Sequence, residues 1–186
     1  MNSIQIAILA LGLALNSFMN FFTSGQSLNS TDFDQKLQAG TIILLSQILM
    51  LGAGLWLGIR IGVLAENSNY LFSVGLLSFI ALKIIFESIR NKADVGSNLL
   101  EKRELIIFTF SEGIIPLLLG ISVGLVVDYL MTAWFILIIF QSIALVSGFY
   151  LSSHRLTLTL KFRLEIIGGL VILAAALKML ISLIGY

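Results

Sequence analysis

Six long apolar runs constrain the fold of this chain more than any other feature. They are Ile4–Phe22, Thr41–Gly58, Tyr70–Ile89, Leu105–Val126, Met131–Leu151 and Leu164–Ile184. A helix needs about 20 apolar residues to cross a bilayer, and these runs lack the alternation of barrel strands. Only 11% of the residues are charged, against roughly 25% in a soluble domain. The sequence therefore predicts an all-α membrane protein with six transmembrane helices in a lipid bilayer.

Composition excludes several classes of function. The net charge of +1 gives no reason to expect a nucleic-acid partner, and the chain has no Cys and a single His, His154. It therefore has no disulfide framework, thiolate metal site or multi-histidine site. No catalytic triad, phosphate loop or HExxH motif is present, so we expect neither an enzyme nor a bound cofactor. The start MNSIQ lacks a basic region, so we expect no cleaved signal peptide.

The basic residues of the loops are distributed unequally. The loops after the first, third and fifth runs carry eight of them, whereas the loops on the other side carry Arg60 alone; the eight are Lys36, Arg90, Lys92, Lys102, Arg103, Arg155, Lys161 and Arg163. Cytoplasmic loops are enriched in Lys and Arg. We therefore expect these three loops in the cytoplasm and both termini outside.

The two halves of the chain resemble each other. QILMLGAGLWLG from Gln47 matches QSIALVSGFYLS from Gln141, and LKII at Leu82 matches LKML at Leu177, at offsets of 94 and 95 residues. We therefore predict two three-helix repeats, 1–91 and 105–186, joined by a cytoplasmic linker at 92–104. Three spans are an odd number, so the second repeat must be inverted relative to the first. Inverted repeats are typical of transporters.

Four amide side chains lie within the apolar runs. Asn16 and Asn20 are one helical turn apart in the first span, and Gln47 and Gln141 lie near the start of the second and fifth spans, on opposite sides of the membrane. A polar group in hydrocarbon is a candidate functional residue, so these amides could line a metal or substrate pathway. Alternatively, they hold helices together with hydrogen bonds worth about 0.6–2 kcal/mol each.

Glu112 is the one carboxylate well inside a predicted span, and it joins the candidate pathway. Glu112 and Lys83 lie about 10 Å deep from the cytoplasmic side, so we expect a structural ion pair between them. Alternatively, Lys83 extends outward to water and Glu112 is protonated. Pro116 predicts a kink in the fourth span, since it removes one backbone hydrogen bond and frees a carbonyl for a partner or a cation.

Three segments resemble a known family. LEIIGGLVILAAALKML at Leu164–Leu180 is similar to the pattern E-I-L-G-G-L-V-L-I-G-I-G, and LLSFIALKIIFESIR at Leu76–Arg90 has a basic residue, a Glu and an Arg at the same spacing as a second pattern. LALGLALNSF from Leu9 is similar to L-A-x-G-x-S-x-D-A-F. These patterns belong to the MntP-type manganese efflux pumps. The resemblance implies a six-span protein of the bacterial inner membrane, built from two three-span repeats.

The chain departs from that family at its acidic positions. The resemblance implies an Asp, a Glu and an Asp in the first, second and fourth spans, where this chain has Asn16, Gln47 and Leu117. Mn²⁺ favours hard, preferably anionic oxygen ligands, and a divalent ion in a low-dielectric site is costly without carboxylates. Glu112 lies five residues before Leu117 and could be a relocated ligand.

Three functions fit these observations. The first is a transporter that exports Mn²⁺ or another cation by alternating access, with the ion as cargo and not as a cofactor. The second is a membrane interaction protein that keeps the scaffold without transporting anything. The third is a transporter of a small polar solute that is not a metal ion, since the amides would suit an uncharged cargo.

Overall fold

A computed structural model describes residues 3–27, 33–65, 68–90, 102–127, 129–152 and 158–184. These ranges contain six helices, namely α1 (Ser3–Ser27), α2 (Phe33–Ala65), α3 (Asn69–Arg90), α4 (Lys102–Gly124), α5 (Leu130–Leu151) and α6 (Leu158–Ile184). Each helix is long and apolar enough to cross a membrane, and the described ranges contain no strand. The prediction of an all-α membrane protein with six spans is confirmed.

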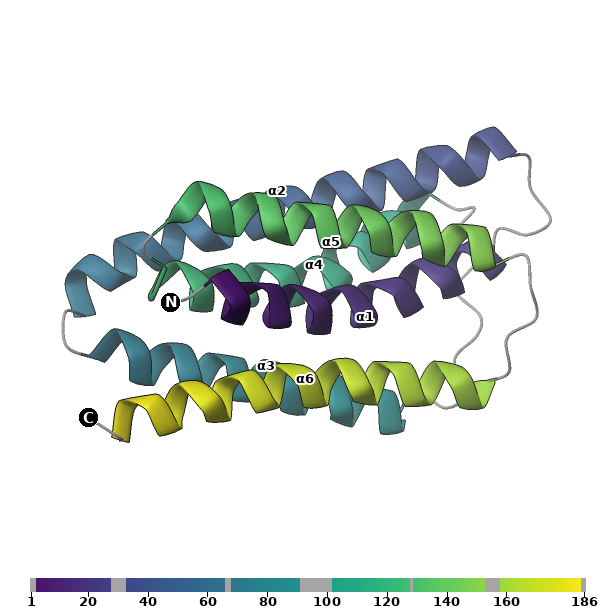
Figure 1. Cartoon of the computed structure of the whole chain (residues 1–186). Helices are drawn as coiled ribbons and strands as arrows, with labels where there is room; N and C mark the ends of the chain where they lie inside the picture. Colours follow the sequence, from purple (N-terminus) through teal and green to yellow (C-terminus); the bar gives the residue numbers. More distant parts are fainter. Residues whose placement is uncertain are drawn as a thin grey trace.

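The helices run alternately up and down in one bundle (Figure 1). α1, α3 and α5 run from the end at which α1 begins and α6 ends, which we call the terminal end, and α2, α4 and α6 run back towards it. The side of the membrane on which the terminal end lies stays a prediction. The predicted linker 92–104 lies outside the described residues up to position 101, and its last three residues belong to α4.

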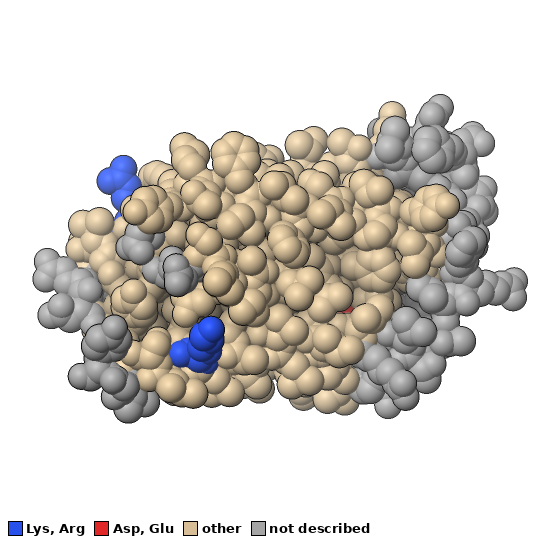
Figure 2. All heavy atoms as spheres, in the orientation of Figure 1, with Lys and Arg blue, Asp and Glu red and all other residues tan. Residues whose placement is uncertain are grey.

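Helices α2 to α6 each bury one stripe and turn an apolar face outward, whereas α1 is mostly buried among the other helices. On α5 the outward side chains recur every three or four residues, and they are Met131, Phe135, Ile139, Ile143, Val146 and Tyr150. This spacing is the helical period, and apolar side chains on the outer face suit contact with lipid rather than water. Figure 2 shows a face that is almost entirely free of charge, with Lys and Arg visible only in the half nearest the terminal end.

The contacts between helices fit the predicted repeat. α2 packs most extensively on α4, α1 packs on α5 and α6, and α3 packs on α6, while smaller seams join α3 to α4 and α2 to α5. Exchanging the two halves replaces α1, α2 and α3 by α4, α5 and α6. This exchange turns the α2–α4 contact into α5–α1 and the α1–α6 contact into α4–α3. It also maps the α2–α5 and α3–α6 contacts onto themselves.

Glycines allow α2 and α4 to touch backbone to backbone. A Cβ on Gly120 would lie 2.5 Å from the carbonyl oxygen of Leu51 and 2.9 Å from the nitrogen of Leu55. Gly54 and Gly124 meet backbone atoms of the facing helix in the same way. Small residues at helix interfaces are the main route to tight packing in lipid, where no hydrophobic force draws helices together. These contacts make α2 and α4 one tightly packed pair.

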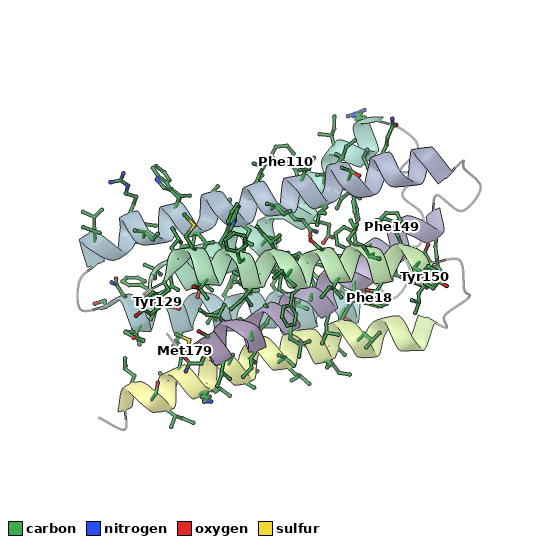
Figure 3. All side chains as sticks on the ribbon, turned by 45° about the horizontal axis from the view of Figure 1, so that its top comes forward. Phe18, Phe110, Tyr129, Phe149, Tyr150 and Met179 are labelled. Atoms are coloured by element: carbon green, nitrogen blue, oxygen red, sulfur yellow. The ribbon has the colours of Figure 1, made fainter. Side chains whose placement is uncertain are left out.

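The equivalent pair, α1 and α5, combines a glycine with aromatic side chains. A Cβ on Gly148 would lie 2.8 Å from the carbonyl oxygen of Phe18, and the rings of Phe21 and Phe149 lie 6.1 Å apart. Figure 3 shows Phe18 and Phe149 on these neighbouring helices. Phe149 also contacts Gly40, since a Cβ there would lie 3.0 Å from its ring. Phe149 therefore links α5 to α2 as well as to α1.

Two serines fasten the smaller seam between α3 and α4. The Ser73 hydroxyl donates to the carbonyl of Ser122 over 2.9 Å, and the Ser122 hydroxyl donates to the carbonyl of Ser73 over 3.0 Å. Both side chains are fully buried. Ser73 lies near the start of α3 and Ser122 near the end of α4, so the contact joins these helices at the terminal end.

Candidate functional site

Glu112 and Asn20 are brought together from the first helix of each half. Glu112 lies in α4 and Asn20 in α1, and the Asn20 amide nitrogen donates a hydrogen bond to Oε2 of Glu112. Both side chains are partly buried. A charged acceptor makes this a strong type of hydrogen bond, and it leaves the amide oxygen of Asn20 free to accept or to ligate. Two of the predicted pathway residues therefore form one polar centre.

Pro116 adds a backbone oxygen to this centre. The helix α4 continues through Pro116, which is buried. A proline has no N–H, so the carbonyl four residues earlier loses its usual helical donor. That carbonyl belongs to Glu112. The same residue thus carries a carboxylate and a main-chain oxygen released from the helix, and both are hard oxygen ligands.

Asn16 lies one turn from Asn20 on α1 and is 7% exposed. It is set against α6, because a Cβ on Gly168 would lie 3.3 Å from the Asn16 backbone nitrogen. This close approach holds the α1 backbone at Asn16 directly against α6. Whether the Asn16 side chain lines a pathway or joins helices stays a prediction.

Lys83 and Glu112 each have a different partner from the one predicted. The Lys83 ammonium lies 2.8 Å from Oε1 of Glu87, one turn along α3, and Glu112 accepts from Asn20. The charge of Lys83 still acts on Glu112 at longer range, together with the charges of Glu87 and Glu165. Sequence reasoning missed Glu87 and Glu165 as neighbours of Glu112. The signal was available, since both acids stand in the two best-matching family segments, LKIIFESIR and LEIIGG.

Gln47 and Gln141 are the most deeply buried of the predicted polar residues. Each is 1% exposed, and both amide atoms of each make no hydrogen bond to the residues that the structure describes. Within the apolar spans, Gln47 is the tenth of the 27 residues Gln38–Leu64, in the first half as expected. Gln141 is the twelfth of the 22 residues Leu130–Leu151, near the middle of its span and not near its start.

The available ligands are mostly neutral oxygens. Within the described ranges, no group of three or more His, Cys, Asp or Glu side chains is close enough to hold a metal ion. The oxygens brought together at Glu112 are its carboxylate, its main-chain carbonyl and the amide oxygen of Asn20. All three are hard oxygen donors, and one carboxylate stands among them.

Comparison with known proteins gives one consistent result. A family model described as "Putative manganese efflux pump" matches residues 30–180. A protein of Methanocorpusculum labreanum named "Putative manganese efflux pump MntP" is 26% identical over 177 residues, covering 94% of each chain. A protein of Gloeothece citriformis with the same name is 27% identical over 187 residues, covering 100% of this chain and 98% of the relative. No solved structure matches.

Proposed function

Because this chain belongs to the manganese efflux pump family, we propose that it exports Mn²⁺ across the cell membrane by alternating access. The family and the six apolar helices make it a membrane cation efflux transporter, and efflux pumps are not an enzyme class. Mn²⁺ is the cargo of this proposal and not a resident cofactor. Lipid and the transported ion are its expected partners.

The contact between Asn20 and Glu112 is the observation that carries the proposal. Carboxylate, amide and main-chain oxygens are the ligand types that Mn²⁺ prefers, and Glu112 supplies two of them beside Asn20. Glu112 lies seven residues into the apolar span Leu105–Gly124 of α4, which is about 10 Å along the helix. A cation at this centre would therefore lie inside the membrane.

Asn16, Gln47 and Gln141 extend the proposed pathway from this centre. We place the end of the bundle opposite the terminal end in the cytoplasm, as the basic loops predict, with both termini outside. Mn²⁺ would enter from that end, reach Glu112 and Asn20, and leave towards the terminal end. The two halves, whose helix contacts map onto each other, would exchange inward-facing and outward-facing arrangements.

Transport of a small polar solute is the second candidate. The specific observation in its favour is that positions 16, 47 and 141 carry uncharged amides, two of which are buried and unbonded. Amides offer both donors and acceptors, so they suit a neutral or zwitterionic cargo. They would hold such a cargo without a net charge to balance.

Growth and metal content under manganese stress test the proposal. The chain is expressed in a strain that lacks its own manganese exporter, and cell Mn is measured at raised external Mn²⁺. We expect the unmodified chain to restore growth and lower cell Mn, and Glu112→Gln to abolish both effects. The neighbouring Ser111→Ala is the matched control, since Ser111 is exposed on the same turn. No rescue by an inserted, unmodified chain would rule out Mn²⁺ as the cargo.

A further inference from the structure

The two tightly packed helix pairs, α2–α4 and α1–α5, match each other contact by contact. Two contacts of the α2–α4 pair recur in the α1–α5 pair when the halves of the chain are exchanged. They are Gly54 with Leu117, matched by Gly148 with Phe18, and Gly58 with Gly124, matched by Ser152 with Gly25. Both matches relate α2 to α5 by 94 residues and α1 to α4 by 99 residues. Because both contacts give the same offsets, the two pairs are packed in the same register.

Helices α3 and α6 also match along most of their lengths. An offset of 95 residues relates the segments LKII and LKML. At this offset the order of buried, half-buried and exposed side chains over residues 72–86 of α3 is repeated over residues 167–181 of α6, except at Lys83. Ser73 of α3 is therefore the counterpart of Gly168 of α6.

The contact of α3 with α4 and that of α6 with α1 do not have the same register. Ser73 is level with Ser122, since each hydroxyl donates to the carbonyl of the other. Its counterpart Gly168 is level with the turn of α1 from Gly12 to Asn16, where three atoms lie within 3.3 Å of an added Cβ. The offset of 99 residues places that turn at residues 111–115 of α4. From the centre of this turn, Ser122 lies about 13 Å further along the helix.

A displacement of α3 and α6 together accounts for this difference. α4 runs towards the terminal end and α1 runs away from it (Figure 1). Both Ser73 and Gly168 therefore meet their partners nearer the terminal end than a symmetrical arrangement would place them. α3 packs extensively on α6, and a Cβ on Gly169 would lie 3.2 Å from the carbonyl oxygen of Ala81. These two helices can therefore move as one body.

We propose that α3 and α6 form a sliding unit, which moves along the two tight pairs by about 13 Å as the transporter changes between its inward-facing and outward-facing states. This structure holds the unit at the terminal end of its travel. In the other state the α3–α4 seam takes the register that the α1–α6 seam has here, and the reverse, as inverted repeats allow. The inference rests on the proposed function, because it supplies the movement for alternating access.

The seam between α3 and α4 leaves room for this movement. It is smaller than its counterpart between α1 and α6, and a groove of about 550 Å³ opens beside it, lined mainly by apolar side chains of α2, α3 and α4. Gly75 lies in this groove, and no atom lies within 4 Å of a Cβ added there. Hydrogen bonds between helices in a membrane contribute little net stability. The bonds between Ser73 and Ser122 therefore close the seam without locking it.

Sliding would change the charge around Glu112. Lys83 and Glu87 of α3 and Glu165 of α6 all act electrostatically on Glu112 in this structure, and all three belong to the sliding unit. Together they carry one net negative charge, and its effect falls as the unit moves away. A cation at Glu112 would therefore be bound more tightly in this state than in the other. Mn²⁺ should accordingly favour this state, because a ligand shifts an equilibrium towards the state that it binds better.

Cysteine pairs test the two registers. The Cβ of Leu15 lies 3.2 Å from a Cβ added at Gly168, and the counterpart of Leu15 in α4 is Ile114. S73C with I114C should therefore form a disulfide in the other state. In this structure Ile114 is about 12 Å along α4 from the level of Ser73, and Cα atoms more than about 7 Å apart cannot be bridged. A protease site inserted between residues 91 and 102 and cut after oxidation lets a non-reducing gel show whether the halves are linked.

S73C with F110C is the matched control. Phe110 and Ile114 are both exposed, and Phe110 lies one turn beyond the end of the proposed travel. In membranes, S73C with S122C and S73C with I114C should both become linked on oxidation, whereas S73C with F110C should not exceed S73C alone. Mn²⁺ should slow the link at Ile114 by about fivefold or more, and Glu112→Gln should remove this effect.

The possible results separate the two proposals. If S73C with S122C becomes linked and S73C with I114C does not, the sliding is overturned. Equal linking at Phe110 and Ile114 also overturns it, because it shows general looseness instead of travel between two positions. Either result leaves export standing if the unmodified chain still rescues cells. Conversely, a link at Ile114 that Mn²⁺ does not slow supports the sliding and counts against Mn²⁺ as the cargo.

Discussion

Gly120→Ala should destabilise the protein through the contact between α2 and α4. The added Cβ would lie 2.5 Å from the carbonyl oxygen of Leu51 and 2.9 Å from the nitrogen of Leu55. Optimal carbon contacts begin at about 3.5 Å, so the two backbones must separate by about 1 Å. Neither contact is with a flexible side chain that could turn away. Overpacking of this kind costs about 1–3 kcal/mol of unfolding free energy.

Gly75→Ala provides the matched control, because no atom lies within 4 Å of a Cβ at Gly75. In an open helical position, alanine is favoured over glycine by about 0.5–1 kcal/mol. The same substitution should therefore have opposite signs at the two positions. Unfolding by sodium dodecyl sulfate in mixed micelles, followed by tryptophan fluorescence, measures both. A Gly120→Ala variant as stable as Gly75→Ala would refute the assignment of α2 and α4 as a backbone-packed pair.

Two further predictions concern transport. The chain has no Cys, and the hydroxyl oxygens of Ser73 and Ser122 lie 2.8 Å apart, so S73C with S122C should form a disulfide between α3 and α4 on oxidation. Export by the double variant should stop on oxidation and return on reduction. The S73C variant alone should stay active under both conditions. If export continues after both thiols have reacted, α3 and α4 do not separate at this end during transport. Separately, Asn16→Asp, Gln47→Glu and Leu117→Asp together restore the acidic pattern of the family. Cells carrying this variant should tolerate more Mn²⁺ than cells with the unmodified chain, and unchanged tolerance would show that the scaffold no longer uses these positions.

The six spans could be predicted because hydropathy over 20 residues is a local property. The partners of Glu112 and Lys83 could not be predicted in the same way. The span boundaries place Lys83 and Glu112 at similar depths, which allowed an ion pair between them. Several other residues at that depth can also pair with Lys83 or with Glu112. Glu87 is four residues from Lys83 on one helix face, and such pairs form whenever the helix forms. The Lys83–Glu87 pair could have been predicted from the segment KIIFE. Because Lys83 is paired within its own helix, Glu112 takes its partner from a different helix.

The partner of Glu112 depends on how the helices pack and could not be predicted from the sequence. Asn20 and Glu112 are 92 residues apart, and their contact depends on how α1 approaches α4, which no spacing in the sequence reports. The sequence placed Gln47 and Gln141 within apolar runs, but it could not report that both amides are fully buried without a hydrogen bond among the described residues, because that depends on how the helices pack.

Packing strength also indicates where the bundle can move. The α2–α4 pair meets through several glycines at backbone distance, and its repeat equivalent, α1–α5, meets through Gly148. Separating either pair would expose close contacts that lipid cannot replace. The α2–α5 seam joins these pairs by a much smaller contact. A change between inward-facing and outward-facing states that preserves both pairs must therefore move one against the other at this seam or move α3 and α6 against both.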